Sequence, residues 1–324
     1  MKTILFLSKG EASVSTRYRA IGYFPFLKQH GWTPQHLRLS RSLHGKIALL
    51  RAAEKAAVVV VLRHGLSFPF LQLLRRAARK LIFDFDDAIF LASDGKPSAV
   101  RMRRFMRTVV LADGILAGNR YLAEKARQVN PHTVLLPTSV DIDRYAGTTT
   151  KAGEFVDLVW IGSRSTYKYL HSILPILEQM SHAEPQLRLK VIADITISSS
   201  HLPVLSLPWQ EASEVTALQS ANIGIAPMYD DPWTRGKCAL KVLQYMASHL
   251  PVISSPVGAN AEIIQNGQTG YLATTSQEWQ SAITTLLASP SLREQMGQSG
   301  YTLCKERYSQ RSCASTLMSA LDAW

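Results

Sequence analysis

The chain has 324 residues, of which 46% are hydrophobic and 19% are charged. These values are typical of a globular protein, and the length allows two domains of ordinary size, each with its own core. No apolar run reaches the roughly 18 residues of a membrane-spanning helix, and residues 1–10 fit a first strand better than a signal peptide. Three scattered cysteines argue against a disulfide framework, and the nine histidines lack metal-ligand spacing.

The positive charge is concentrated in one half of the chain. Residues 1–150 contain 24 Lys and Arg against 10 Asp and Glu, whereas residues 151–324 contain 12 against 14. The two halves therefore carry net charges of +14 and −2. A basic half could bind nucleic acid or an anionic membrane surface, and the absence of a nucleic-acid motif favours the membrane. We expect a peripheral membrane surface as a partner and no nucleic acid.

Strands and helices alternate along the first half. Apolar runs predict strands at residues 3–8, 33–39 and 57–62, with helices near 15–30 and 42–54 between them. The third run contains four consecutive valines and is apolar toward both faces, as in a central parallel strand covered by helices on both sides. The pattern predicts a Rossmann-like α/β domain.

Gly10 begins the loop between the first strand and the first helix, where a Rossmann-like domain contacts its ligand. The loop lacks the G-x-G-x-x-G pattern, so a dinucleotide site is not expected. Arg17 and Arg19 follow at the start of the helix. They are either ligand contacts or charges on the helix surface, and the sequence leaves both interpretations open.

Two basic segments follow. The helix expected at 68–80 ends in Arg75, Arg76, Arg79 and Lys80, and cations are favourable at a helix C-terminus through the helix dipole. A second helix, 101–109, interleaves arginines with apolar residues. Because both helices lie in the basic half, we hypothesise a membrane-binding face.

Three carboxylates, Asp84, Asp86 and Asp87, end the strand that begins at Leu81. Clustered carboxylates are costly and belong at an exposed functional strand end. A divalent-metal site is one interpretation. At least one of the three is expected to cap the next helix or to pair with a nearby arginine.

A further strand and helix surround Asn119. The strand expected at 113–119 passes through a glycine turn into the helix 120–127, for which Asn119 is the expected N-cap. A sixth strand is expected at 134–136. Residues 147–153 have the composition of a linker.

The second half repeats the alternation. A strand at 156–161 leads into a loop of glycine and hydroxyl residues at a helix start, which forms an expected anion cradle with Arg164 and Lys168. Strands follow near 187–193 and 203–208. Trp209 comes after the second of them and is expected either to stack on a nucleotide base or to pack at the rim of the core.

The stretch 230–258 is the most informative part of the sequence. A strand at 222–226 is followed by a polar loop with Arg235 and Lys237, and then by an amphipathic helix with Lys241 in its first turn. Free amides, the positive end of a helix dipole and these cations predict an anion site, most naturally for a diphosphate. A solvated basic loop is the alternative.

This block also carries a family resemblance. The residues that carry it are Arg235-Gly236-Lys237-Cys238, Lys241, Gln244-Tyr245-Met246-Ala247, 251–260, Glu262-Ile263-Ile264, Asn266-Gly267 and Thr269-Gly270-Tyr271-Leu272. They resemble retaining family-4 glycosyltransferases of the GT-B fold, and more closely the bacterial subgroup that assembles surface polysaccharides. The match is tight over this block and loose over most of the remaining chain.

The resemblance implies an α/β fold of the GT-B type, with two Rossmann-like domains facing across a cleft and a C-terminal helix crossing back to the N-terminal domain. Residues 1–148, with that helix at about 309–324, would bind the acceptor, and 149–308 would bind the nucleotide-sugar. A sugar would pass from a nucleotide-diphosphate-sugar to a glycan or lipid-linked acceptor with retention, in cell-surface polysaccharide or lipopolysaccharide biosynthesis. A cytoplasmic location and no metal or other cofactor are expected.

The resemblance and the local patterns together give three sets of site residues. The expected catalytic residues are Asp86, Asp87, Arg235 and Lys241. The expected donor-binding residues are Gly162, Ser163, Arg164, Thr166, Lys168, Trp209, Lys237, Gln244, Asn260 and Glu262. The expected acceptor-binding residues are Gly10, Arg17, Arg19 and Asn119.

Two departures from the family pattern bear on function. The family's Glu-x7-Glu signature falls on Gly236 and Gln244, and its His-Asp pair falls on Asp86-Asp87. Gln244 can still accept a hydrogen bond from a ribose hydroxyl through its amide oxygen. The loss of both glutamates also motivates the alternative of a non-catalytic GT-B-like module that binds a sugar nucleotide or a partner.

Overall fold

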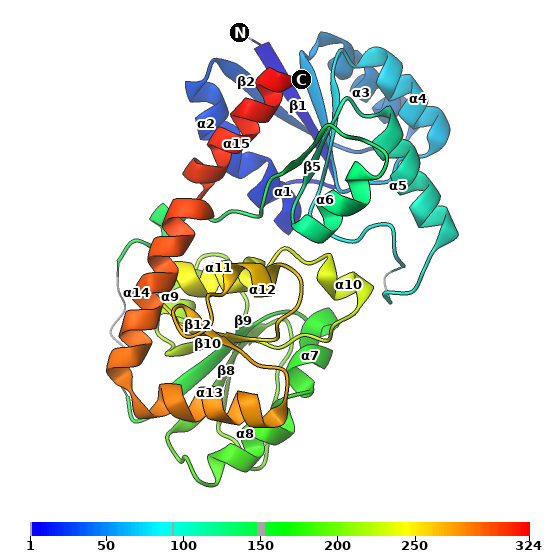
Figure 1. The fold of residues 1–324 in the computed structure, drawn as a ribbon. Coiled ribbons are helices and arrows are strands. Elements are labelled where there is room, and N and C mark those ends of the chain that lie inside the picture. The colour runs from blue at the N-terminus through cyan, green and yellow to red at the C-terminus, as the bar shows by residue number, and fades with distance from the viewer. Residues whose placement is uncertain (1, 93, 148–152) are drawn as a thin grey trace. The chain divides into compact units, whose positions relative to one another are not determined.

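The computed structural model describes residues 2–92, 94–147 and 153–324. Its contacts divide the chain into two compact units, each built on a six-stranded sheet (Figure 1). Unit 1 comprises Met1–Ser139, Asp231–Cys238 and Gln310–Trp324, and unit 2 comprises Val140–Asp230 and Ala239–Ser309. Residues 148–152 of the expected linker, and the expected domain boundary between 148 and 149, lie outside the described residues, so that boundary stays a prediction.

The sheet of unit 1 is parallel throughout, with the order β2-β1-β3-β4-β5-β6. Its strands are β1 (Lys2–Ser8), β2 (Trp32–Arg38), β3 (Val58–Leu62), β4 (Leu81–Phe85), β5 (Gly114–Ala117) and β6 (Thr133–Leu135). The valines of β3 are buried on both faces, as predicted for a central strand. The strand order reverses between β1 and β3, which is where doubly wound sheets bind ligands outside the carboxyl ends of their strands.

Helices cover both faces of this sheet. They are α1 (Val14–Arg19), η1 (Ile21–Tyr23), α2 (Phe24–Gln29), α3 (Leu43–Lys55), α4 (Phe68–Ala77), α5 (Ala99–Leu111), α6 (Arg120–Arg127), the short α10 (Pro232–Arg235) and α15 (Gln310–Ala323). The single helix expected over 15–30 is broken into three pieces. The break lies where Gly22 contacts Gln310 of α15 so closely that a Cβ would lie 2.1 Å from the Gln310 amide nitrogen.

The sheet of unit 2 is also parallel, with the order β12-β11-β10-β7-β8-β9. Its strands are β7 (Val156–Ile161), β8 (Leu187–Ala193), β9 (Val204–Pro208), β10 (Ile223–Ala226), β11 (Val252–Ser254) and β12 (Gly270–Leu272). Numbered within the unit, this is the Rossmann order 3-2-1-4-5-6, with its switch point between β7 and β10.

The helices of unit 2 include two that the sequence patterns did not predict, α13 (Ser276–Ala288) and α14 (Pro290–Arg307). The others are η2 (Ile142–Tyr145), η3 (Arg164–Thr166), α7 (Tyr167–His171), α8 (Leu174–Ser181), α9 (Glu214–Gln219), α11 (Leu240–Ala247) and α12 (Ala259–Ile263). Helix α11 is buried along most of its length, which agrees with the apolar spacing of its residues.

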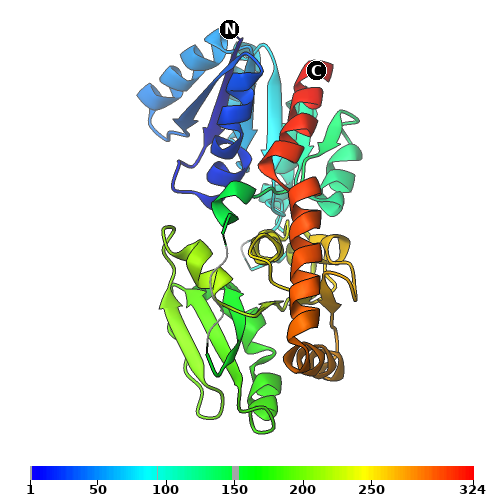
Figure 2. The same cartoon turned by 90° about the vertical axis from the view of Figure 1, so that its left-hand side faces the viewer.

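The last helix returns to unit 1, as expected. After α14 the chain leaves unit 2, and α15 packs against α2 and η1 in unit 1 (Figure 2). Cys313, Leu317 and Leu321 of α15 share a core cluster with residues of β1 and β3. Gly114 has no room for a side chain because the Trp324 ring lies 2.4 Å from where its Cβ would be.

Candidate functional site

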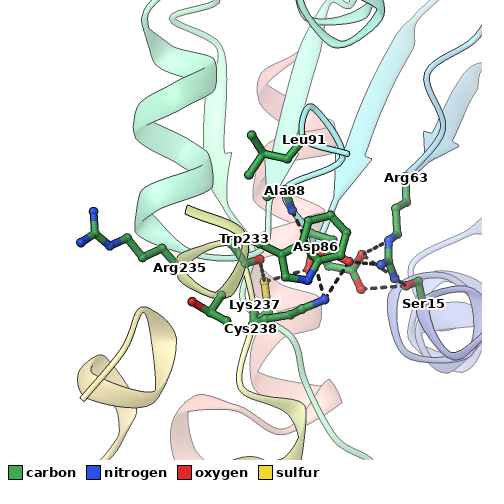
Figure 3. Close-up of polar contacts among 12 residues, drawn as sticks. Ser15, Arg63, Asp86, Ala88, Leu91, Trp233, Arg235, Lys237 and Cys238 are labelled. Carbon is green, nitrogen blue, oxygen red and sulfur yellow. Dashed lines mark hydrogen bonds and ion pairs between the residues drawn. The ribbon is translucent and has the colours of Figure 1, made fainter. Parts of the chain in front are cut away.

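Polar side chains gather at the carboxyl edge of the first sheet. They come from α1, from the residue that follows β3, from the residues that follow β4, and from the returning segment Asp231–Cys238 (Figure 3). All belong to unit 1. The carboxyl edge is where the ligand sites of such sheets are found, so we describe this cluster as a candidate functional site.

Asp87 is the buried centre of the cluster, with only 1% of its side chain exposed. Its carboxylate accepts both hydrogen bonds of Lys237 Nζ, at 3.0 Å to each oxygen, and forms an ion pair with the Arg63 guanidinium. The backbone N–H of Ala88 donates a further hydrogen bond of 3.1 Å. The enclosed carboxylate holds Arg63 and Lys237 in place. No ligand contact of Asp87 is tested, so its expected catalytic role stays a prediction.

Asp86 is more accessible, with 14% of its side chain exposed. Ser15 Oγ donates to Asp86 Oδ2 at 2.9 Å, Arg63 Nη1 donates to Ser15 Oγ at 2.7 Å, and Arg63 Nε lies 3.6 Å from Asp86 Oδ1. Burial opposes the charge of Arg63, but Asp86 and Asp87 outweigh it, so the pKa of Arg63 is raised. Ser15, Arg63 and Asp86 thus form a fixed polar group in which Asp86 can accept a hydrogen bond from a ligand.

Arg63 has a left-handed backbone, with φ of 45°. This conformation is unfavourable for a residue other than glycine by roughly 1–2 kcal/mol. The hydrogen bond from its backbone N–H to the carbonyl of Asp84, at 2.7 Å, helps to hold it. In this conformation the guanidinium of Arg63 reaches the carboxylates of both Asp86 and Asp87.

The segment Asp231–Cys238 is fixed to the ends of β4 and β5. Asn119 Nδ2 donates to the carbonyls of Arg235 and Lys237, each at 2.9 Å, while its Oδ1 caps α6 through the N–H of Leu122. The N-cap prediction for Asn119 is confirmed. The residue is 3% exposed and its amide anchors the returning segment, while the expected acceptor contact stays a prediction.

Two glycines permit this close approach. A Cβ on Gly118 would lie 2.5 Å from Cys238 Sγ, and one on Gly236 would lie 2.6 Å from Ala88 Cβ. Gly236 occupies the first position of the family's glutamate pair, and here no side chain fits. The thiol of Cys238 is 8% exposed and lies 3.3 Å from the carbonyl of Asp86. Burial raises the pKa of this thiol, so it remains protonated and packs rather than reacts.

Arg19 and Asp84 form a separate, buried pair. Arg19 Nε and Nη2 donate to the two oxygens of Asp84, the latter at 2.7 Å, and Nη1 donates to the Leu136 carbonyl at 3.0 Å. Both side chains are 1% exposed. Asp84 lies inside β4, whereas the sequence placed it at an exposed strand end. Arg19 is therefore not a surface charge but ties α1 to the sheet, and its expected ligand contact stays a prediction.

The remaining unit 1 candidates do not join the cluster. The side chain of Arg235 is exposed and points away from Asp86 and Lys237 (Figure 3). Arg17 is half-buried on α1. Gly10 has a φ of +132°, a backbone conformation that favours glycine, in the loop after β1. A Cβ built at this position would lie 3.7 Å from Cδ of Arg38. None of these positions is tested as a ligand contact, so they stay predictions.

In unit 2, Lys241 lies in the first turn of α11. Its Nζ is 4.4 Å from the centre of the Trp160 ring. Trp160 is the penultimate residue of β7 and is 1% exposed. Ala239 precedes the helix with a left-handed backbone, φ 55°, and its side chain does not cap the first turn. Lys237 pairs with Asp87 in unit 1, Arg235 points away from that pair, and Lys241 belongs to unit 2. The anion site expected from these three cations stays a prediction.

Gln244 is buried on the same helix and bonds a carboxylate. Its Nε2 donates to Glu214 Oε1 at 2.9 Å, and Trp209 Nε1 donates to Glu214 Oε2 at 2.7 Å. Glu214 and Gln244 are 5% and 4% exposed, whereas Trp209 is 38% exposed. The departure to glutamine thus preserves a carboxylate beside the helix, but it comes from α9.

Two backbone N–H groups of the loop after β7 already donate hydrogen bonds to side chains of the protein. The N–H of Ser163 donates to Thr166 Oγ1 at 3.1 Å, and the N–H of Arg164 donates to Asp194 Oδ1 at 2.7 Å. Two amides of the expected anion cradle are therefore engaged, and the helix that follows, α7, is short. Gly162 is required because the Trp160 ring would lie 2.2 Å from a Cβ there. Lys168 Nζ lies over the Tyr169 ring at 5.0 Å.

The last two donor candidates lie on α12. Asn260 is 2% exposed, and its Nδ2 donates to Ser254 Oγ at 2.9 Å, which ties α12 to the end of β11. Glu262 is exposed on the same helix. The positive φ of Gly258, 51°, allows the turn between them and the strand.

Comparison with known proteins assigns the fold. Residues 158–289 match the family described as group 1 glycosyl transferases. The structure of HepE from Anabaena in complex with UDP is 14% identical in sequence and has a TM-score of 0.76. The superposition covers 100% of this chain and 100% of HepE. Sucrose-phosphate synthase from Thermosynechococcus elongatus is 14% identical with a TM-score of 0.76, over 100% of this chain and 99% of that one. A glycosyltransferase from Rickettsia africae is 12% identical with a TM-score of 0.73, over 98% and 97%.

The fold is GT-B. The family match covers most of unit 2 and the segment Asp231–Cys238 of unit 1, and together with the fold it supports a glycosyltransferase. No curated protein sequence matches the chain. Within residues 2–92, 94–147 and 153–324, three or more His, Cys, Asp or Glu side chains are nowhere grouped to hold a metal ion, and no helix combines the length and apolarity needed to cross a membrane. The expectation of a metal-independent reaction stays a prediction.

Several residues of the clusters were missed from sequence. Ser15 and Arg63 in unit 1 and Trp160 and Glu214 in unit 2 were not identified as candidates. Arg63 could have been found, because it directly follows a buried parallel strand and so lies at the same edge as Asp86. Glu214 has no such signal, since its contact with Gln244 depends on the packing of α9 against α11.

Proposed function

We propose that this chain is a retaining glycosyltransferase that moves a sugar from a nucleotide-diphosphate-sugar to a glycan or lipid-linked acceptor in cell-surface polysaccharide or lipopolysaccharide synthesis. The observation that carries the proposal is the group 1 glycosyltransferase match over 158–289, which includes the whole of α11 with Lys241 and Gln244. Neighbours of the same fold were solved with UDP and with UDP-glucose, which supports a nucleotide-sugar donor.

Unit 2 would bind the donor. Lys241 sits in the first turn of α11, where backbone N–H groups and the helix dipole favour an anion. We assign it to the leaving diphosphate, whose negative charge grows as the glycosidic bond breaks. Gln244 has its Nε2 on Glu214, so its Oε1 is the atom assigned to a ribose hydroxyl. Trp209, partly exposed and held by the same carboxylate, is assigned to the base.

Unit 1 would bind the acceptor, with Asp86 as the carboxylate that contacts a sugar hydroxyl. Asp86 is exposed enough for such a contact, and Ser15 and Arg63 fix its orientation. Asp87 and Lys237 act as positioning residues beneath it. In this mechanism the donor diphosphate accepts the acceptor's proton on the face from which it leaves, so retention requires no protein nucleophile.

The donor assignment is tested by thermal unfolding with UDP, GDP, ADP and CMP and their common sugar conjugates. We expect one nucleoside diphosphate to stabilise the chain selectively, by about 2.7 kcal/mol at a hundredfold excess over its dissociation constant. The Lys241→Met variant should lose most of this shift, and Lys305→Met, on the exposed side of α14, should keep it. No shift with any nucleotide would favour a non-catalytic module.

We also propose that the chain works at the cytoplasmic face of a membrane, through α4 and α5. These helices pack side by side and expose Leu73, Val100 and Val110 at 49%, 58% and 60%. Exposed apolar residues among arginines are typical of interfacial helices. The guanidinium of Arg107 lies over the Phe68 ring at 4.3 Å, which joins the two helices at this surface.

Flotation with vesicles tests the membrane proposal. Vesicles of phosphatidylcholine and phosphatidylglycerol should carry the chain, whereas pure phosphatidylcholine should not. Arg103→Glu with Arg107→Glu should abolish flotation, because each basic residue near an anionic surface contributes about 1 kcal/mol. The matched reversal Lys305→Glu with Arg311→Glu should have little effect. Flotation that is indifferent to anionic lipid would contradict the proposal.

A further inference from the structure

Unit 1 contains a groove of about 980 Å³ apart from the Asp86 cluster. Its lining residues are Lys9, Arg38, Leu39, Ser40, Arg41, Lys46, His64, Gly65, Leu66, Ser67, Phe70 and Arg104. They follow the carboxyl ends of β1, β2 and β3 or come from α3, α4 and α5. The groove therefore lies beside the point between β1 and β3 where the strand order reverses.

The charge of this groove has one sign. Six of its twelve lining residues are Lys, Arg or His, and none is Asp or Glu. Within the described residues, Lys9, Arg38, Arg41 and Arg104 have no carboxylate partner. Lys46 Nζ lies 5.8 Å from the Phe70 ring centre. Glu11, the acid near the mouth, lies 3.5 Å from His36. Clustered cations without acids repel one another, so the site is suited to an anion from outside the protein.

Two helix N-termini add to this field. Ser40 and Arg41 immediately precede α3, which has 13 residues, and Ser67 is the N-cap of α4, which has 10. Ser42 caps α3, but the side chain of Ser67 makes no capping hydrogen bond. Backbone N–H groups in the first turn of a helix, with the helix dipole, bind phosphate groups well.

His64 reports the local potential. Burial lowers its pKa first, and Lys9, Arg104 and Arg41 lower it further. These three cations come from the end of β1, from α5 and from the segment before α3, and they face the imidazole from separate elements. Three of the five permanent cations of the groove therefore act on one imidazole of its lining.

We propose that this groove receives a phosphate or diphosphate group carried by the acceptor substrate. Five permanently charged side chains match a multiply charged phosphate better than a single carboxylate. The Phe70 ring is buried, so it is not available to stack on a nucleotide base. The assignment to the acceptor rests on the proposed function, in which unit 1 binds the acceptor; the phosphate chemistry rests on the groove alone.

Titration calorimetry with inorganic pyrophosphate tests the proposal on the full chain, and repeating each titration with Lys241→Met distinguishes pyrophosphate bound at the proposed donor site of unit 2. The test variant is Arg41→Ala with Arg104→Ala, and the matched control is Arg51→Ala with Lys55→Ala, which removes two exposed charges of α3 outside the groove. We expect the test variant to bind pyrophosphate about 10- to 100-fold more weakly than wild type, since charge-assisted hydrogen bonds are lost. The control should bind like wild type. Equal losses in both variants, or no loss in either, would overturn the proposal.

Two further arms separate the possible failures. Nucleoside diphosphate binding should be unchanged in the test variant, because the donor site lies in unit 2. If neither wild type nor either variant binds a nucleoside diphosphate, while pyrophosphate binding still depends on the groove, the glycosyltransferase proposal is contradicted and the phosphate site is supported. The last arm adds vesicles of phosphatidylcholine and phosphatidylglycerol. Pyrophosphate that stays bound supports an acceptor-borne phosphate, whereas displacement by the vesicles would assign the groove to lipid headgroups and overturn the acceptor assignment.

Discussion

Replacing Asp87 by asparagine is expected to lower the free energy of unfolding by about 3 kcal/mol. The change removes the carboxylate that pairs with Lys237 and leaves Arg63 with Asp86 alone. The expected loss is at the low end for a buried ion pair because the side chains of Arg63 and Lys237 are 38% and 29% exposed to solvent. Urea unfolding followed by circular dichroism measures it.

The control is Asp94→Asn, which removes a carboxylate from an exposed pair with Lys96 and should leave the midpoint unchanged. A second variant, Asp87→Asn with Lys237→Met, removes one of the stranded cations and should recover part of the loss. Equal stability of Asp87→Asn and Asp94→Asn would show that the cluster does not hold the segment Asp231–Cys238, and the positioning role of Asp87 would be wrong.

Changing Lys241 to methionine is expected to reduce the turnover number by about 100- to 1000-fold, since a group that stabilises transition-state charge typically contributes this much. Methionine removes the charge and the cation–π contact, and its thioether can still lie against the Trp160 ring. The thermal midpoint should therefore stay close to that of wild type, which separates a chemical role from a structural one. Initial rates with a saturating donor give the measurement.

Two comparisons sharpen this prediction. Lys305→Met makes the same substitution on exposed α14 and should leave the rate unchanged. Lys241→Arg keeps the charge and should recover part of the activity. Full turnover by Lys241→Met would refute the assignment of Lys241 to the leaving diphosphate, whatever the binding data show.

The fold could be predicted from sequence because its signals are local. The valine run of β3 and the apolar run of β7 are buried on both faces of their sheets, and the alternation with helices fixes a doubly wound α/β pattern. The strand bounds at β7 and β8 agree with the predicted ones. The break between α1 and α2 was not predicted, because it depends on the contact of Gly22 with α15, nearly 290 residues away in the sequence.

The site was harder to predict, since charge alone does not say whether a residue is buried. Arg19 is two residues from Arg17, yet it lies inside the unit with Asp84, while Arg17 is half-buried on α1. Lys237 and Lys241 are only four residues apart in the sequence, but Lys237 belongs to unit 1 and Lys241 to unit 2. Such partners become visible only when the tertiary contacts are known.

Gln244 shows how a departure from a family pattern can mislead. From sequence, the loss of a glutamate here argued for a non-catalytic module. In the structure, Glu214 supplies a buried carboxylate 2.9 Å from the Gln244 amide and holds the Trp209 indole with its second oxygen. A carboxylate is therefore present beside α11 even though the expected one is not.

The central claim is that the chain transfers a sugar from a nucleotide-sugar donor. The most direct measurement is release of the nucleoside diphosphate from the donor selected by thermal unfolding, with the anomeric configuration of the product followed by NMR. The account predicts diphosphate release that depends on Lys241 and a product with the configuration of the donor. Selective donor binding without any release, or a product of inverted configuration, would contradict it.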